Sequence, residues 1–104
     1  MTRSANPMRG EAEFGIAGKT VLLRPSFENL VAAEEEIGSL FALVERASEG
    51  AITVAEITAI LWHCIEPQPR PPREDVGRAV LESGLVEAIK PVRAILAQVL
   101  QGQT

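Results

Sequence analysis

Apolar and polar positions alternate near the start of the chain, which is typical of a β-hairpin. Ala12, Phe14 and Ile16 alternate with glutamates and a glycine, the period of a strand with one buried face. Residues 20–24 supply a second strand of β-branched and aliphatic side chains, and Ala17-Gly18 lies between the two strands as a turn. The pattern predicts a hairpin over residues 11–24, preceded by a flexible lead over residues 1–10. Because an isolated hairpin is marginal in water, we expect its apolar face to lie on helices.

After the hairpin, the apolar residues recur at helical spacing. Each apolar stretch follows a residue suited to begin a helix, and the predicted N-caps are Ser26, Ser39 and Thr53. In the first helix, Phe27 is placed on the core-facing side together with Leu30. The predicted helices span residues 26–37, 39–49, 53–65, 72–83 and 85–101, and the last is expected to break near Pro91, since proline lacks an N–H.

Four of the seven prolines lie between Glu66 and Arg73, which predicts a stiff, extended connector over residues 66–72. A chain of 104 residues leaves no room for a second core. The sequence therefore predicts one mostly helical α+β domain over residues 11–101, with an N-terminal β-hairpin followed by four or five short helices packed around one core.

The charge of the chain narrows its class of partners. The formal net charge is −4, and the acidic excess is spread along the sequence, so nucleic-acid binding is not expected. A single cysteine excludes an intrachain disulfide. No apolar run approaches the roughly 20 residues of a membrane span, and no secretory signal begins the sequence, so we expect a cytoplasmic protein without membrane contact.

The residues that most resemble catalytic groups do not form a site. His63 and Cys64 are adjacent on a predicted helix and point about 100° apart, so they cannot chelate one ion. Cys64 falls on the apolar stripe, as a small buried hydrophobe does. Glu34, Glu35 and Glu36 fan out around a helix, which is typical of a solvated face. We expect no enzyme activity, no cofactor and no metal.

Contact with other proteins is the remaining kind of function. The acidic run offers negative charge to a basic partner, and the single tryptophan is either half-buried at the core edge or an exposed anchor for a partner. The proline-rich connector is either a rigid linker or a ligand for an aromatic-lined groove. The C-terminal apolar pair and the hairpin edges are further docking candidates, which leaves homo-oligomerisation open. The candidate partner-binding residues are Arg24, Glu34, Trp62, Val99 and Leu100.

Two short segments frame the hairpin, Asn6-Pro7-x-Arg9-Gly10-Glu11 and Leu22-x-Arg24-Pro25-Ser26-Phe27. With the acidic end of the first helix at Gly38, the helix–Gly–helix unit over residues 43–61 and Gly84-Leu85-x-Glu87-Ala88, they resemble the gene-transfer-agent tail assembly chaperone family. Members of this family, found in gene transfer agents and prophages, have also been labelled tail tube proteins. The resemblance covers roughly residues 6–101 and carries over no catalytic residue.

This resemblance implies a non-enzymatic role in building a phage tail. Such a chaperone binds the tape measure protein and promotes polymerisation of the tail tube protein. The alternative is a structural component of the tail tube. A weaker alternative is a host regulatory adaptor that uses the proline-rich connector as a peptide ligand.

Overall fold

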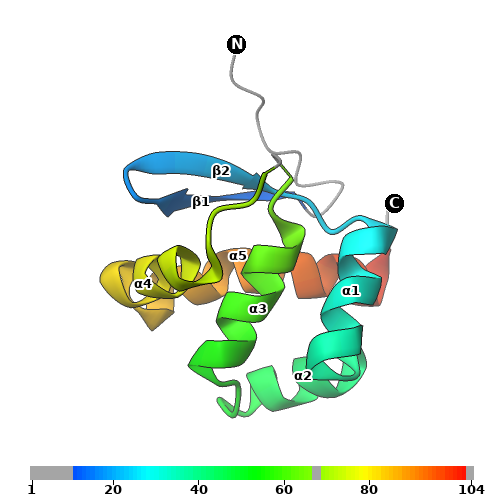
Figure 1. The fold of residues 1–104 in the computed structure, drawn as a ribbon. Helices are drawn as coiled ribbons and strands as arrows, with labels where there is room; N and C mark the ends of the chain where they lie inside the picture. The colour runs from blue at the N-terminus through cyan, green and yellow to red at the C-terminus, as the bar shows by residue number, and fades with distance from the viewer. Residues whose placement is uncertain (1–10, 67–68, 103–104) are drawn as a thin grey trace.

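A computed structural model describes residues 11–66 and 69–102 and shows a hairpin followed by five helices (Figure 1). Strands β1 (Ala12–Ile16) and β2 (Lys19–Leu23) pair antiparallel, with Ala12 opposite Leu23. The two turn residues, Ala17 and Gly18, have φ of 51° and 78°, as a two-residue hairpin turn of type I′ requires. The predicted fold class is confirmed. The predicted flexible lead, residues 1–10, lies outside the described residues.

The helices begin at the side chains that the sequence indicates. Ser26, Ser39 and Thr53 each accept a hydrogen bond from the backbone N–H three residues later, and Thr53 with Glu56 completes a capping box. The helices are α1 (Phe27–Ile37), α2 (Leu40–Ser48), α3 (Val54–Cys64), α4 (Arg73–Ser83) and α5 (Leu85–Gln101).

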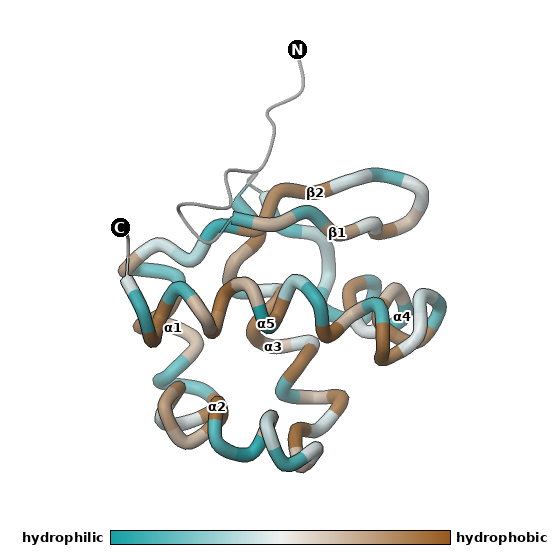
Figure 2. The backbone as a smooth tube through the Cα atoms, turned by 180° about the vertical axis from the view of Figure 1, so that it is seen from behind, coloured by the Kyte–Doolittle hydropathy of each residue, from teal (hydrophilic) through white to brown (hydrophobic). Residues whose placement is uncertain are grey.

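Helix α3 lies at the centre of the helical layer and has more buried residues than any other helix. Figure 1 shows α1 and α4 on either side of α3, α5 passing behind it, and the hairpin lying across the top. Seen from behind in Figure 2, apolar segments of α5 alternate with polar ones, as in a helix with one buried face. The largest fully buried side chains are Leu23, Leu43, Ile57, Ile60, Leu61, Ile65, Val76, Val80, Val92 and Ile95.

The end of α3 and the start of the connector extend the hairpin. Leu23 and Ile65 form an antiparallel bridge, Arg24 N donates to the Cys64 carbonyl at 2.7 Å, and Glu66 N donates to the Leu22 carbonyl at 3.0 Å. The outer edge of β2 is therefore covered at its C-terminal end. Strand addition by a partner, considered for this edge from the sequence, is blocked at these residues.

The predicted break near Pro91 is wrong, because α5 is one continuous helix of 17 residues with Pro91 inside it. Pro91 itself is buried, and Ala88 and Val92 on the same face are fully buried in the core. The missing proline N–H leaves only the Glu87 carbonyl without its helical donor, at an exposed position where water can reach it. The packing of Pro91 and its neighbours against the core thus outweighs the tendency of proline to break a helix.

Candidate functional site

Trp62, a candidate binding residue near the end of α3, contacts the connector. The guanidinium carbons of Arg70 and Arg73 lie 5.0 and 4.6 Å from the centre of its ring, within the range of cation–π contact. Its Nε1–H donates to the Pro71 carbonyl at 2.9 Å. Trp62 is therefore half-buried, and these contacts use the arginines that a proline-and-arginine ligand would present to a partner.

Glu36 is the centre of the charges around this tryptophan. Both of its oxygens accept hydrogen bonds from Arg73, and Oε1 also accepts one from His63 Nε2 at 2.8 Å. Arg70 donates to the Asn29 side-chain oxygen and to the His63 carbonyl. The hydrogen bonds from Arg73 and then His63 lower the Glu36 pKa from 4.5 to about 2. Glu36 thus ties α1 to α3 and to the start of α4.

Arg24 has a similar joining role at the end of β2. Its guanidinium lies 3.3 Å from the Glu66 carboxylate and 3.7 Å from that of Glu11, and its carbonyl accepts a hydrogen bond from the Asn29 side chain at 2.9 Å. Because these contacts hold the hairpin, α1 and the connector together, most of the binding capacity of Arg24 is used within the chain. The structure thus gives Arg24 a role in joining these elements, and this role requires no partner protein.

The other three candidates differ in how much surface they offer. Glu34 is exposed, but its carboxylate accepts a hydrogen bond from Leu40 N at 3.1 Å and so joins α1 to α2. Val99 is half-buried and packs against the core. Leu100 is 51% exposed. Leu100 is therefore the candidate with the largest free apolar surface.

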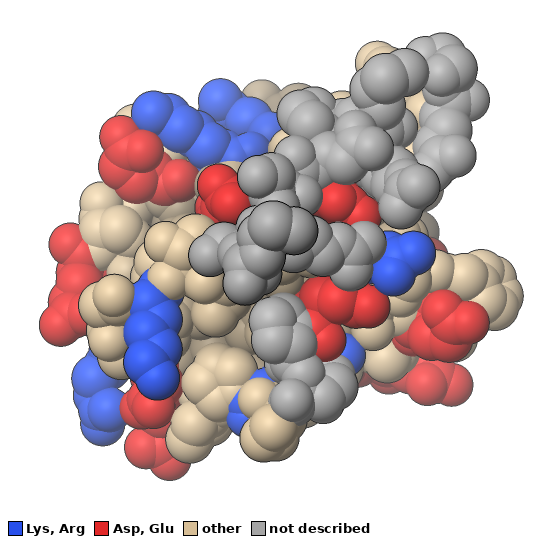
Figure 3. Space-filling model, turned by 90° about the horizontal axis from the view of Figure 1, so that it is seen from above, with Lys and Arg blue, Asp and Glu red and all other residues tan. Residues whose placement is uncertain are grey.

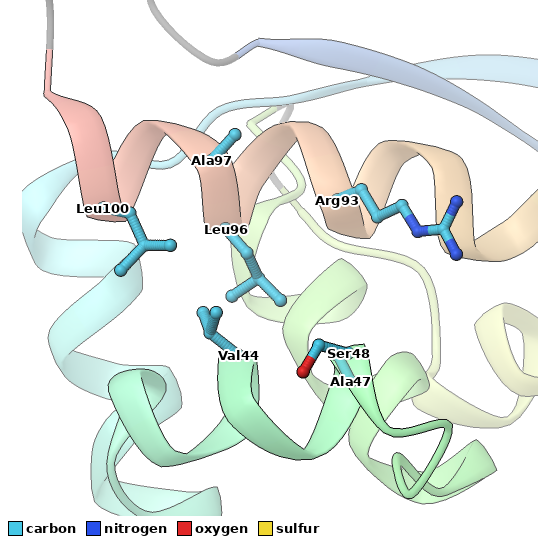
Figure 4. A pocket seen from close by; sticks show the side chains of 7 residues that line it. All are labelled: Val44, Ala47, Ser48, Arg93, Leu96, Ala97 and Leu100. Carbon is cyan, nitrogen blue, oxygen red and sulfur yellow. The ribbon is translucent and has the colours of Figure 1, made fainter.

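Leu100 lines an open groove between α2 and α5, called here the α2–α5 groove (Figure 4). Its volume is about 290 Å³. Arg93 stands at one end of the α5 side and Leu100 at the other, with Leu96 and Ala97 between them (Figure 4). The residues that line the groove are Val44, Ala47 and Ser48 from α2, and Arg93, Leu96, Ala97 and Leu100 from α5.

Phe27 is a surface residue that the sequence analysis placed wrongly. It is 78% exposed, because the buried side of α1 is the one that carries Asn29 and Ala33. Val31, one turn further along, is 36% exposed on the same outer side. An aromatic residue at the first position of a helix does not indicate by itself whether its side chain is buried, so the sequence did not reveal this exposure.

The described residues offer little reactive chemistry. Cys64 is fully buried, which confirms it as a packing residue, and burial raises the pKa of its thiol to about 12, which opposes formation of the thiolate. No group of three or more His, Cys, Asp or Glu within residues 11–66 and 69–102 is arranged to hold a metal ion. Among the helices of these residues, none has the length and apolarity to cross a bilayer.

The hairpin side of the molecule is neither uniformly acidic nor uniformly basic. On the face seen in Figure 3, basic and acidic side chains lie beside one another. Elsewhere over the described residues, several charges are paired with one another: Arg46 with Glu56, Arg78 with Asp75 and Lys90 with Glu87. Where the face in Figure 3 consists of described residues, it shows no continuous basic stripe of the kind that binds a nucleic-acid backbone.

The family described as phage tail tube protein, GTA-gp10, has a model that matches residues 9–102. No curated protein and no solved structure matches the chain. Because the match spans nearly all of the sequence, the chain belongs to this family of phage tail proteins. The family expected from the two segments around the hairpin is thereby confirmed.

Proposed function

We propose that this member of the tail tube protein, GTA-gp10 family acts as a non-enzymatic tail assembly chaperone. In this role it binds the tape measure protein and promotes polymerisation of the tail tube around it. The observation that carries the proposal is the architecture. The described residues contain one sheet of two five-residue strands, whereas five helices make up most of the fold. A subunit that builds a tube wall is expected to have a larger β-sandwich or barrel.

Exposed apolar side chains support a role in binding an aggregation-prone partner. Phe27, Phe41, Leu81 and Val86 are each more than 60% exposed, and they lie on four different helices. Large apolar and aromatic side chains are common at the buried centre of protein–protein interfaces. Several charges of the described residues are already paired with one another, and these exposed apolar side chains remain available for contact with a partner.

Co-expression with the tape measure protein from the same tail gene cluster tests this function. We expect a larger soluble fraction of the tape measure protein and recovery of a complex with this chain. A Leu43→Asp variant, which places a carboxylate at a fully buried core position, is the unfolded control and should give no protection. Equal aggregation of the tape measure protein with and without the wild-type chain would refute the chaperone function.

A structural tail component is the second candidate, and the family's own description as a tail tube protein favours it. The two functions differ in whether the finished particle contains this chain. A chaperone leaves before the tail is complete, whereas a structural subunit stays in it. Mass spectrometry of purified, DNase-treated particles separates them, since stoichiometric recovery of this chain in the particles would replace the chaperone function with the structural one.

A further inference from the structure

We propose that the α2–α5 groove binds the outer face of α1 from a second copy of this chain, so that the protein self-associates head to tail. This contact goes beyond the binding of other tail proteins. Three features of the structure support it: a matching apolar surface on each side, one unpaired charge of opposite sign on each side, and similar spacing along the two helices.

The donor surface is the side of α1 that faces away from α3. Phe27, Val31 and Glu35 follow one another at intervals of four residues, so they form a single line along the helix. All three are exposed, Phe27 by 78%. Glu35 has no hydrogen bond or ion pair within the part of the chain that the structure describes. This line therefore presents two apolar side chains followed by a free carboxylate.

The acceptor surface is the α2–α5 groove itself. Five of its seven lining residues are apolar, and Leu100 at one end is half exposed. Arg93, at the other end, has no carboxylate partner within residues 11–66 and 69–102. Arg24, Arg46 and Arg73, by contrast, each have at least one. The groove therefore presents an apolar floor followed by a free guanidinium.

The spacing of the two surfaces agrees. Phe27 and Glu35 are eight positions apart, or about 12 Å along a helix, and Leu100 and Arg93 are seven positions apart, or about 10 Å. With Phe27 against Leu100, Glu35 of the second copy reaches Arg93. In this register the incoming α1 runs antiparallel to α5.

A helix suits this groove better than an extended segment does. Its backbone N–H and C=O groups are already paired within the helix, whereas a strand would lay unpaired backbone groups over apolar side chains. The donor face and the groove are different surfaces of the same chain. Each contact is therefore heterologous and leaves a free face at one end and a free groove at the other, so association continues beyond the dimer.

Sedimentation velocity of the full-length protein tests this contact, from about 10 µM to about 1 mM, a range suited to a small interface. We expect the average mass to rise above the monomer value of 11.2 kDa with concentration. Phe27→Ser on the donor face and Ala97→Arg in the groove should each weaken association about tenfold or more. Both positions are exposed, so far-UV circular dichroism should stay unchanged. Val86→Ser, at a side chain 76% exposed elsewhere on α5, is the matched control and should associate like wild type.

Mixing the two variants gives the sharpest result. The Phe27→Ser chain keeps its groove and the Ala97→Arg chain keeps its α1 face, so the mixture should form a dimer and stop there. Arg93→Glu and Glu35→Arg should each weaken association, and the double variant should recover it. A wild-type protein that stays monomeric throughout the range, a mixture that does not associate, or equal loss in Val86→Ser would overturn the contact. None of these outcomes depends on binding of the tape measure protein.

Discussion

Replacing Glu36 by glutamine removes the charge that joins α1, α3 and the start of α4. Arg73 donates to both carboxylate oxygens, and His63 donates to one of them at 2.8 Å. The glutamine keeps the size of the side chain and one acceptor oxygen, so the substitution tests the charge rather than the packing. We expect Glu36→Gln to fold to the same structure with lower stability.

The size of the effect follows from the pKa and the exposure of the carboxylate. A pKa lowered from 4.5 to about 2 corresponds at most to about 3 kcal/mol of stabilisation. The side chain is 39% exposed, however, and exposed ion pairs contribute about 0.2–1 kcal/mol because water screens them. We therefore expect a loss of about 1 kcal/mol at pH 7, or about 4–8 °C in Tm for a domain of this size.

The stability difference between wild type and Glu36→Gln should also change with pH in one direction. Because the folded pKa of Glu36 is lower than the unfolded one, its contribution is fully present above about pH 5 and is lost as the pH falls towards 2. The difference between wild type and Glu36→Gln should therefore shrink over that interval, since protonation removes the same charge from the wild type. Other acidic groups with lowered pKa, such as Glu56, affect both proteins equally.

Urea unfolding followed by far-UV circular dichroism at pH 7, 5, 4 and 3 measures this difference. Glu82→Gln is a matched control, because Glu82 is likewise the penultimate residue of an 11-residue helix and is exposed. It should change the free energy of unfolding by less than about 0.5 kcal/mol. If Glu36→Gln and Glu82→Gln behave alike at pH 7, or if the Glu36→Gln difference is the same at pH 3 as at pH 7, the reasoning from the ion pair is wrong.

Two further predictions concern the backbone and the buried thiol. Gly84→Ala should destabilise the fold by about 1–3 kcal/mol in urea unfolding, because φ is 87° and ψ 150° at the junction of α4 and α5. Gly77→Ala within α4 should instead stabilise the fold by about 0.4–1 kcal/mol, since the added Cβ meets the Thr58 methyl at an ordinary 3.8 Å. The reverse order of stabilities would contradict both assignments. Cys64, with a pKa of about 12, should react with a thiol reagent only as fast as the chain unfolds, and rapid labelling of the native protein at pH 7 would show that the site opens locally.

Local features of the fold were predictable because short-range chemistry determines them. The three side-chain caps of α1, α2 and α3 follow from one residue and its neighbour three positions later, and the hairpin follows from alternation over five residues. The break expected at Pro91 shows the limit of such reasoning. A proline removes one hydrogen bond, which the sequence reveals, but the burial of the same residue against the core depends on the other helices.

The contacts around Trp62 were beyond the sequence because they join distant positions. Glu36 lies 27 residues from His63 and 37 from Arg73, and no pattern within α1 separates it from Glu34 or Glu35. The sequence left Trp62 either half-buried or exposed, and the structure shows the half-buried ring. Its cover of two guanidinium groups arises only when the connector folds back over α3.

Self-association and partner binding would use separate parts of α5. The proposed contact covers Leu100 and Arg93, in the C-terminal half of the helix. Leu81, Leu85 and Val86 remain exposed at the α4–α5 junction, where α5 begins. Leu85 and Leu100 are 15 positions apart, about 22 Å along the helix, so a partner at the junction need not displace a second copy from the groove. A self-associated form could therefore still offer apolar surface to a tail partner, and head-to-tail growth would present that surface repeatedly, which raises the effective concentration along a long partner.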